Sequence, residues 1–115
     1  MDTEWMAQLS GIYGVQCVIL VDLDGLVVTQ TGEVAEELAP HSALMVKQLL
    51  DRIGVTVMEK WLWTQCETEK LIIGVANVEV GILVILMDPE ANLGMVRLEA
   101  RNIRRALRRK FAQVG

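Results

Sequence analysis

The sequence predicts one α+β domain over residues 1–115, in which a five-stranded, mainly antiparallel sheet lies between layers of helices. Two observations lead to this fold class. Short apolar runs of strand length alternate with turn residues, whereas two longer segments have the apolar period of a helix. In chain order the elements read helix, two strands, helix, three strands, helix, and 115 residues are enough for one core.

The first three elements are a short helix and a hairpin. The helix is expected to end at Gly11, because glycine often ends a helix. Residues 15–21 are nearly all apolar and rich in β-branched side chains, which is typical of a central strand buried on both faces. Asp24 and Gly25 then predict a turn, which requires positive φ, before a second strand that closes at Gly32.

Residues 33–52 have a helical period with two apolar stripes. One stripe consists of Val34, Leu38, Met45, Leu49 and Ile53, and the other of Ala35, Ala39, Val46 and Leu50. A helix with two apolar stripes must bury one on its own sheet and the other on something else. Pro40 removes a hydrogen bond from a helix interior at a cost of about 3 kcal/mol, so we expect a kink or a fresh helix start there.

Three strands and a long helix follow. The third strand is predicted over residues 55–66, with Trp61 and Trp63 on one face, and its turn over residues 67–70. Residues 71–87 read as a hairpin turned at 77–79. The last helix has an apolar side that consists of Val96, Ala100, Ile103, Leu107 and Phe111.

The last helix is also strongly basic. Before Arg97 fourteen acids face four cations, a charge of about −10, and from Arg97 onward seven cations face one acid, about +6, which gives the net −4. This face is either solvated or a docking surface for an acidic protein, nucleic acid or anionic lipid. Arg101, Arg105 and Arg108 are the candidate residues for a second protein partner. Nucleic acid is disfavoured by the acidity of the chain and by the lack of aromatic residues between the arginines.

Catalytic and metal-binding motifs are absent from the sequence, so we expect no enzyme and no cofactor. Asp22 to Gly25 resembles the start of a calcium loop, but Leu26 and the valines after it replace the further oxygen ligands. His41 is the only histidine and has no cysteine or histidine nearby. Neither Ser10 nor Ser42 lies in a nucleophile elbow, and the chain has no phosphate-binding loop.

The cysteines and the N-terminus favour a cytoplasmic protein. Cys17 and Cys66 lie in apolar strand-like runs without metal-site spacing, so we expect buried free thiols. The acidic start is neither a signal nor a transit peptide. Asn77 and Glu79 interrupt the most apolar stretch, which therefore predicts a hairpin and no integral membrane association.

Three segments in order resemble the roadblock domain, the fold of the dynein light chain of that name and of bacterial regulators of Ras-like GTPases. They are Val21–Val28 after a short helix, the hairpin 71–87, and Asn92–Arg97 at the start of the last helix. The resemblance covers almost the whole chain and implies a three-layer, profilin-like sandwich. Pro40 departs from the uninterrupted second helix of the family.

The resemblance implies a homodimer joined through the second helix and the third strand, in one sheet that runs across both subunits. The apolar excess, 52% of residues, also favours association with another chain. The expected interface residues are Met45, Leu49, Ile53, Val57, Glu59, Trp61 and Trp63. The expected docking residues for a partner are Ala39, Ser42 and Lys47, above the strand that contains the two tryptophans.

By this resemblance the chain would be a non-enzymatic signalling scaffold that binds a small Ras-like GTPase and modulates its nucleotide cycle. It would act on the switch residues of the GTPase without donating a catalytic arginine. Two alternatives stay open. One is a dimeric adaptor without GTPase regulation, like the light chain. The other is a small-molecule sensor, which the scarcity of polar groups among the core-facing residues disfavours.

Overall fold

A computed structural model describes residues 4–32, 45, 48, 51–52 and 62–114. Its helices are α1 (Glu4–Ser10) and α4 (Leu93–Val114). Its strands are β1 (Val15–Asp22), β2 (Val27–Gly32), β3 (Trp63–Glu67), β4 (Ile72–Asn77) and β5 (Gly81–Met87). They form one open antiparallel sheet in the order β2-β1-β5-β4-β3. The predicted α+β class and five-stranded antiparallel sheet are therefore confirmed.

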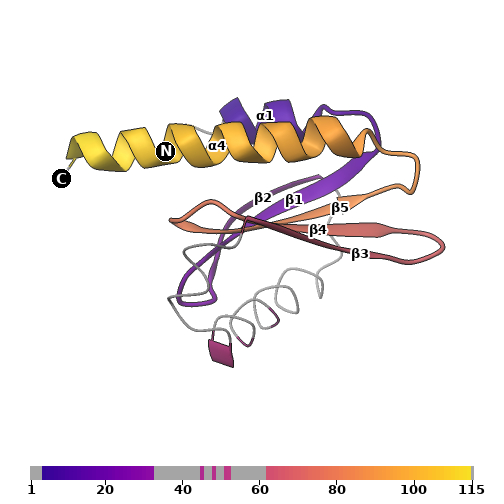
Figure 1. Cartoon of the computed structure of the whole chain (residues 1–115), viewed down its shortest axis with the longest axis horizontal. Coiled ribbons are helices and arrows are strands. Elements are labelled where there is room, and N and C mark those ends of the chain that lie inside the picture. The colour runs from indigo at the N-terminus through magenta and orange to yellow at the C-terminus, as the bar shows by residue number, and fades with distance from the viewer. Residues whose placement is uncertain (1–3, 33–44, 46–47, 49–50, 53–61, 115) are drawn as a thin grey trace.

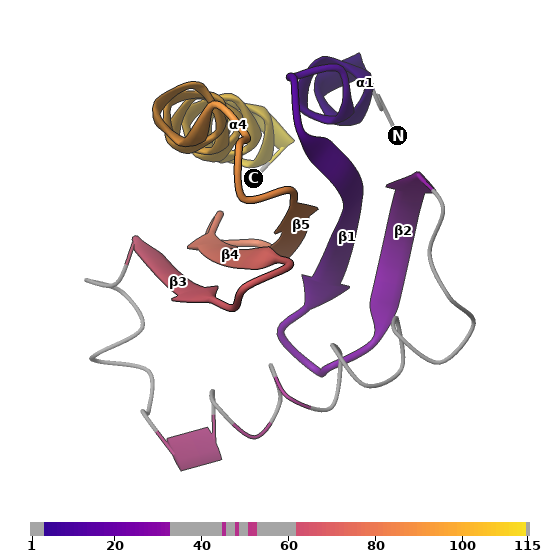
Figure 2. The same ribbon diagram turned by 90° about the vertical axis from the view of Figure 1, so that its right-hand side faces the viewer.

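Helices α1 and α4 lie on the same side of the sheet. Figures 1 and 2 show them side by side above the strands, whereas the described residues between 45 and 52 lie on the other side. Residues 45, 48, 51 and 52 are helical, as predicted. The rest of the predicted second helix, including Pro40 and His41, and the predicted strand residues 55–61 lie outside the described residues.

The centre of the sheet is apolar on both faces, which explains why its strands are continuous hydrophobic runs. Every residue of β5 is buried, and β1 is buried from Cys17 to Val21. On one face, Val18, Leu20 and Leu83 pack with Met6 and Leu9 of α1 in the main core cluster. The residues of α4 in this cluster are Val96, Ala100, Ile103 and Leu107, as the sequence predicts. The side chain of Phe111 lies outside the described part.

The first hairpin turns where the sequence predicts, but its turn has a different backbone conformation from the one expected. A two-residue turn of the expected type needs positive φ at both central residues. Gly25 has a φ of 85°, whereas Asp24 is not among the residues with positive φ. Instead, Asp22 Oδ1 accepts hydrogen bonds from the backbone N–H groups of Asp24 at 2.9 Å and Leu26 at 3.0 Å. The Asp22 side chain therefore adds to the backbone bonds of the turn, in which the Asp22 N–H donates to Leu26 O at 2.9 Å and the Gly25 N–H to Asp22 O at 3.1 Å.

The third strand and the cysteines require two corrections. The turn after β3 begins one residue later than predicted, because Glu67 still pairs with Ile72 and the Thr68 N–H donates to Leu71 O at 2.8 Å. Cys17 and Cys66 are free, and Cys17 is buried as expected, but Cys66 is exposed. The reason is that side chains alternate along β3, so Cys66 lies on the face opposite Trp63 and Gln65, away from α4.

The Cys17 thiol is predicted to resist alkylation in the folded protein. Burial raises the pKa of this thiol, and a backbone hydrogen bond from Leu86 offsets only part of the increase. Because the thiolate is the reactive form, a buried thiol with a raised pKa reacts slowly at neutral pH. In a Cys66→Ser variant, mass spectrometry should detect no iodoacetamide adduct until denaturant is added. Rapid labelling of the native variant would contradict this burial.

The Asp22 side chain is predicted to be the structural acid of the hairpin. Asp22→Ala leaves two backbone N–H groups without their acceptor and should lower the free energy of unfolding by about 1–2 kcal/mol in urea denaturation. Asp24→Ala is the matched control, because that exposed side chain makes neither bond and should change stability by less than about 0.5 kcal/mol. Equal losses in the two variants would refute the turn mechanism.

Candidate functional site: an arginine-lined groove

A groove of about 460 Å³ lies between α4 and the β3–β4 edge of the sheet. One wall consists of five arginines of α4, namely Arg97, Arg101, Arg104, Arg105 and Arg108. The floor is mostly apolar and consists of Leu62, Trp63, Ala76 and Ala100, with Asn77 beside them. We call this surface the arginine groove.

The five arginines share one side of α4 because of their spacing. They recur at intervals of three and four residues, which places side chains on one face of a helix. This stripe borders the buried apolar stripe that contains Ala100 and Ile103, so the helix buries one side and turns its guanidinium groups toward the sheet edge. The helix begins at a defined point, since Asn92 Oδ1 accepts a hydrogen bond from the Met95 N–H at 3.2 Å.

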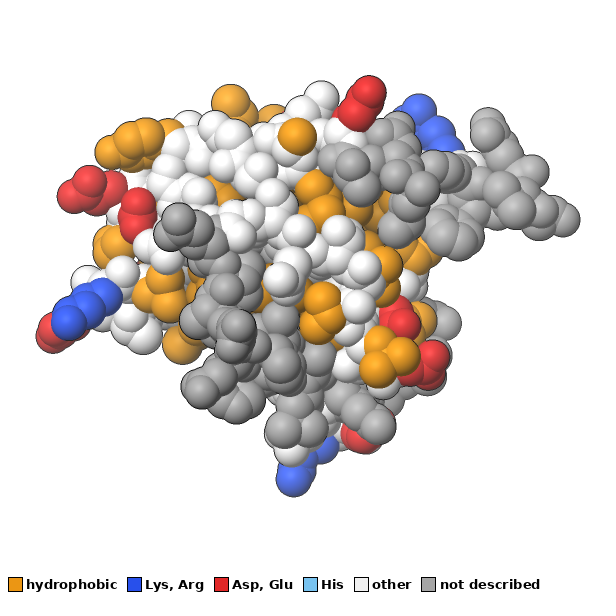
Figure 3. All heavy atoms as spheres, turned by 180° about the vertical axis from the view of Figure 1, so that it is seen from behind, with side chains coloured by type: hydrophobic (Ala, Val, Ile, Leu, Met, Phe, Trp, Pro, Cys, Tyr) orange, Lys and Arg blue, Asp and Glu red, His pale blue; other side chains and the backbone are white. Residues whose placement is uncertain are grey.

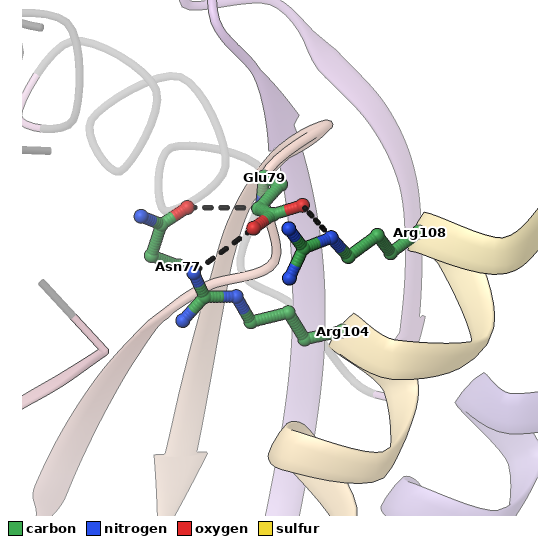
Figure 4. Close-up of polar contacts among 4 residues, drawn as sticks. All are labelled: Asn77, Glu79, Arg104 and Arg108. Atoms are coloured by element: carbon green, nitrogen blue, oxygen red, sulfur yellow. Dashed lines mark hydrogen bonds and ion pairs between the residues drawn. The ribbon is translucent and has the colours of Figure 1, made fainter. Parts of the chain in front are cut away.

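One carboxylate from the β4–β5 turn contacts two of the arginines that line the groove. Glu79 Oε1 accepts a hydrogen bond from Arg104 Nη2 at 3.0 Å, and Arg108 Nε lies 3.6 Å from Glu79 Oε2 (Figure 4). Glu79 has a φ of 70°, the one positive φ among the described non-glycine residues. Asn77 Oδ1 accepts the Glu79 N–H at 2.9 Å and so holds this turn in place. The Arg104 side chain is only 15% exposed, so this ion pair is partly shielded from water.

Trp63 forms the other end of the groove. Its ring packs over Gly74, where an added Cβ would clash with the indole. The Arg97 guanidinium carbon lies 5.9 Å from the ring centre, which is within cation–π range, and Trp63 Nε1 donates to Gln65 Oε1 at 3.0 Å. Trp63 is therefore a half-buried ring that an arginine covers from the helix side.

The Trp63 ring lies on the face of the sheet that α4 covers. The physical reason is Gly74, whose missing side chain leaves room for the indole on that face. Strand β3, which contains Trp63, is an edge of the described sheet.

The structure brings together the three arginines predicted as a second partner surface, because Arg101, Arg105 and Arg108 all line the groove. Of the other predicted interface residues, only Met45 and Trp63 are described, and Met45 is 44% exposed. The predicted residues that lie outside the described part are Leu49, Ile53, Val57, Glu59, Trp61, Ala39, Ser42 and Lys47.

Three groove residues, Asn77, Arg97 and Arg104, and the adjoining Glu79 were not predicted as site residues from the sequence. The helical spacing of the arginines could have identified two of them. Glu79 in the β4–β5 turn contacts Arg104, which is 25 residues later in the chain. The spacing of residues in the sequence does not predict such a contact between separate elements.

The described side chains contain no evident metal centre. Within the described residues, no group of three or more histidine, cysteine, aspartate or glutamate side chains could hold a metal ion. No helix in the described part of the chain is long and apolar enough to cross a membrane.

Comparison with known proteins gives structural matches alone. No family model and no curated protein sequence matches the chain. The roadblock/LC7 domain from Streptomyces avermitilis superposes with a TM-score of 0.76 at 18% identity, over 97% of this chain and 99% of that domain. Myxococcus xanthus MglB gives a TM-score of 0.78 at 20% identity, over 96% and 97% of the two chains. The gliding protein MglB from Thermus thermophilus gives 0.75 at 19% identity, over 93% and 85%.

The first two of these superpositions cover both partners almost from end to end, so the likeness concerns the whole domain and not one hairpin or helix. The element order, the strand order and the shared coverage lead to one conclusion: the chain has the roadblock/LC7 fold.

Proposed function

We propose that the chain forms a homodimer that binds a small Ras-like GTPase and regulates its nucleotide cycle. The observation that carries this proposal is the match to roadblock/LC7 and MglB structures over more than nine-tenths of the chain. Resemblance to the roadblock domain implies GTPase regulation, and the motifs that carry it lie in β1, β2, the β4–β5 hairpin and the start of α4. The proposed role is non-enzymatic, since the sequence contains neither a phosphate-binding loop nor a nucleophile with its base.

Dimerisation is proposed through the edge strand β3 and the helix that contains Met45. An edge strand presents backbone groups that can pair with a second chain. The Met45 side chain is 44% exposed in the single chain, and it belongs to one of the two apolar stripes of the predicted second helix. Large apolar side chains reach the surface elsewhere too, as the orange atoms on the face in Figure 3 show. A stable interface of this kind buries about 1,600 Å².

We expect Met45→Glu to lower the molar mass measured by light scattering from that of a dimer to that of a monomer, because a charge would be buried in the interface. Met95→Glu is the matched control. Met95 is 48% exposed, lies on α4 and does not line the arginine groove, so this variant should remain dimeric. A wild-type chain that is monomeric at micromolar concentration would contradict the proposal.

The GTPase is proposed to dock on the side of the sheet away from α4. This side contains the described helical residues between 45 and 52, next in sequence to the predicted docking residues Ala39, Ser42 and Lys47 (Figure 1). Gln48, Asp51 and Arg52 are exposed there and provide polar groups for such a contact. A regulator that repositions the switch segments must distinguish the two nucleotide states, because these segments are ordered by the γ-phosphate.

Titration should therefore show tighter binding to the GTPase loaded with a non-hydrolysable GTP analogue than to its GDP form, by about tenfold or more. The partners to test are the Ras-like GTPases of the same organism. The triple variant Arg101→Glu, Arg105→Glu, Arg108→Glu should bind equally well, since α4, which contains these residues, lies on the opposite side of the sheet (Figure 2). Equal affinity for both nucleotide states would favour the adaptor, and loss of binding in the triple variant would place the GTPase on α4.

A further inference from the structure

The arginine groove concentrates positive charge on a chain that is acidic elsewhere. Five guanidinium groups line it, whereas Glu79 is the single carboxylate that contacts them within the described residues. The chain before Arg97 has a charge of about −10, so this concentration is local. Charge of one sign in a concave site attracts ligands of the opposite sign.

Glu79 shows how the groove holds a carboxylate. Its two oxygens contact two arginines that are one helical turn apart, Arg104 at 3.0 Å and Arg108 at 3.6 Å (Figure 4). Glu79 therefore supplies an anion from within the chain for the two arginines at this end of the groove. The guanidinium groups of Arg101 and Arg105 have no hydrogen bond or ion pair with any described residue, and Arg97 contacts the Trp63 ring.

The apolar floor of the groove favours a ligand that also has an apolar group. Leu62 is 51% exposed, and the half-buried Trp63 ring lies beside it. A ligand that is only an anion would leave these side chains in contact with water. A ligand with both carboxylates and an apolar side chain would cover them and gain the free energy of apolar burial.

The spacing of the arginines matches an extended peptide. Arg97, Arg101 and Arg105 are four residues apart, which is about 6 Å along a helix axis. Alternate side chains of an extended chain are about 6.6 Å apart and point to the same side. We propose that the arginine groove binds an extended acidic peptide segment of a second protein, with carboxylates at alternate positions on the arginines and an apolar side chain on Leu62 and Trp63.

The observations favour a peptide over other polyanions. Single-stranded nucleic acid is bound by several aromatic rings on which successive bases stack, whereas this groove contains a single ring. A membrane surface is flat and cannot enter a groove, so anionic lipid would reach the outer arginines but not the apolar floor. This site lies across the sheet from the proposed GTPase surface, so its test is independent of GTPase binding, whereas its floor shares Trp63 with the strand β3 through which the dimer is proposed.

The probe is a short fluorescein-labelled peptide with glutamate at every second position and one central leucine, titrated into the full-length chain and followed by fluorescence polarisation. Arg105→Glu should weaken binding by at least about fivefold, because it replaces attraction by repulsion. Arg109→Glu has the same charge change on the same helix, but Arg109 does not line the groove, so the loss should be under about twofold. A peptide with glutamine at the same positions should not bind.

Glu79→Gln provides the opposite test. It removes the internal carboxylate from Arg104 and Arg108, so the peptide should bind about threefold more tightly. The control is Glu90→Gln, the same charge change at an exposed acid outside the groove, which should leave the affinity unchanged. Equal losses in Arg105→Glu and Arg109→Glu, or no gain in Glu79→Gln, would overturn the proposal. So would tighter binding of single-stranded DNA or of anionic phosphatidylserine vesicles than of the peptide.

Discussion

The central strand β5 sets the constraint on which the rest of the fold depends. All its residues are buried, and it pairs with β1 on one side and β4 on the other. A strand without a polar side chain satisfies its hydrogen-bonding groups only through these ladders, and both of its faces must be kept from water. Helices on each side of the sheet are the ordinary means, and α1 and α4 provide them on one side.

The same constraint explains why the charged side of α4 is available for binding. The helix must present an apolar stripe to the sheet, which fixes Val96, Ala100, Ile103 and Leu107. It crosses the sheet near the β3–β4 edge, where Trp63 replaces the missing side chain of Gly74. The side chains next to the apolar stripe therefore line a groove and do not simply point into solvent. Packing decides the position of the groove, and composition decides its charge.

The sequence predicted most of the fold because its signals are local. The apolar run of β1, the Asp22–Gly25 turn and the 71–87 hairpin each contain their information within a few residues. The expected burial of Cys66 was wrong, because an apolar run in the sequence does not show whether each face of its strand is covered. In the groove, the helical period of the sequence predicts that the arginines share one side of the helix. The contact between Arg104 and Glu79 joins two separate elements and is visible only in the structure.

The arginine stripe lowers the stability of α4 when no partner is bound. Arginines four residues apart on one helix repel each other, and each such pair destabilises a helix by about 0.2–0.5 kcal/mol. Glu79 relieves this repulsion at one end only, between Arg104 and Arg108. Dissolved salt screens like charges and opposite charges alike. Raising the ionic strength should therefore stabilise the free helix while it weakens the attraction of any anionic partner, so that the stability of the chain and its affinity for that partner respond to salt in opposite directions.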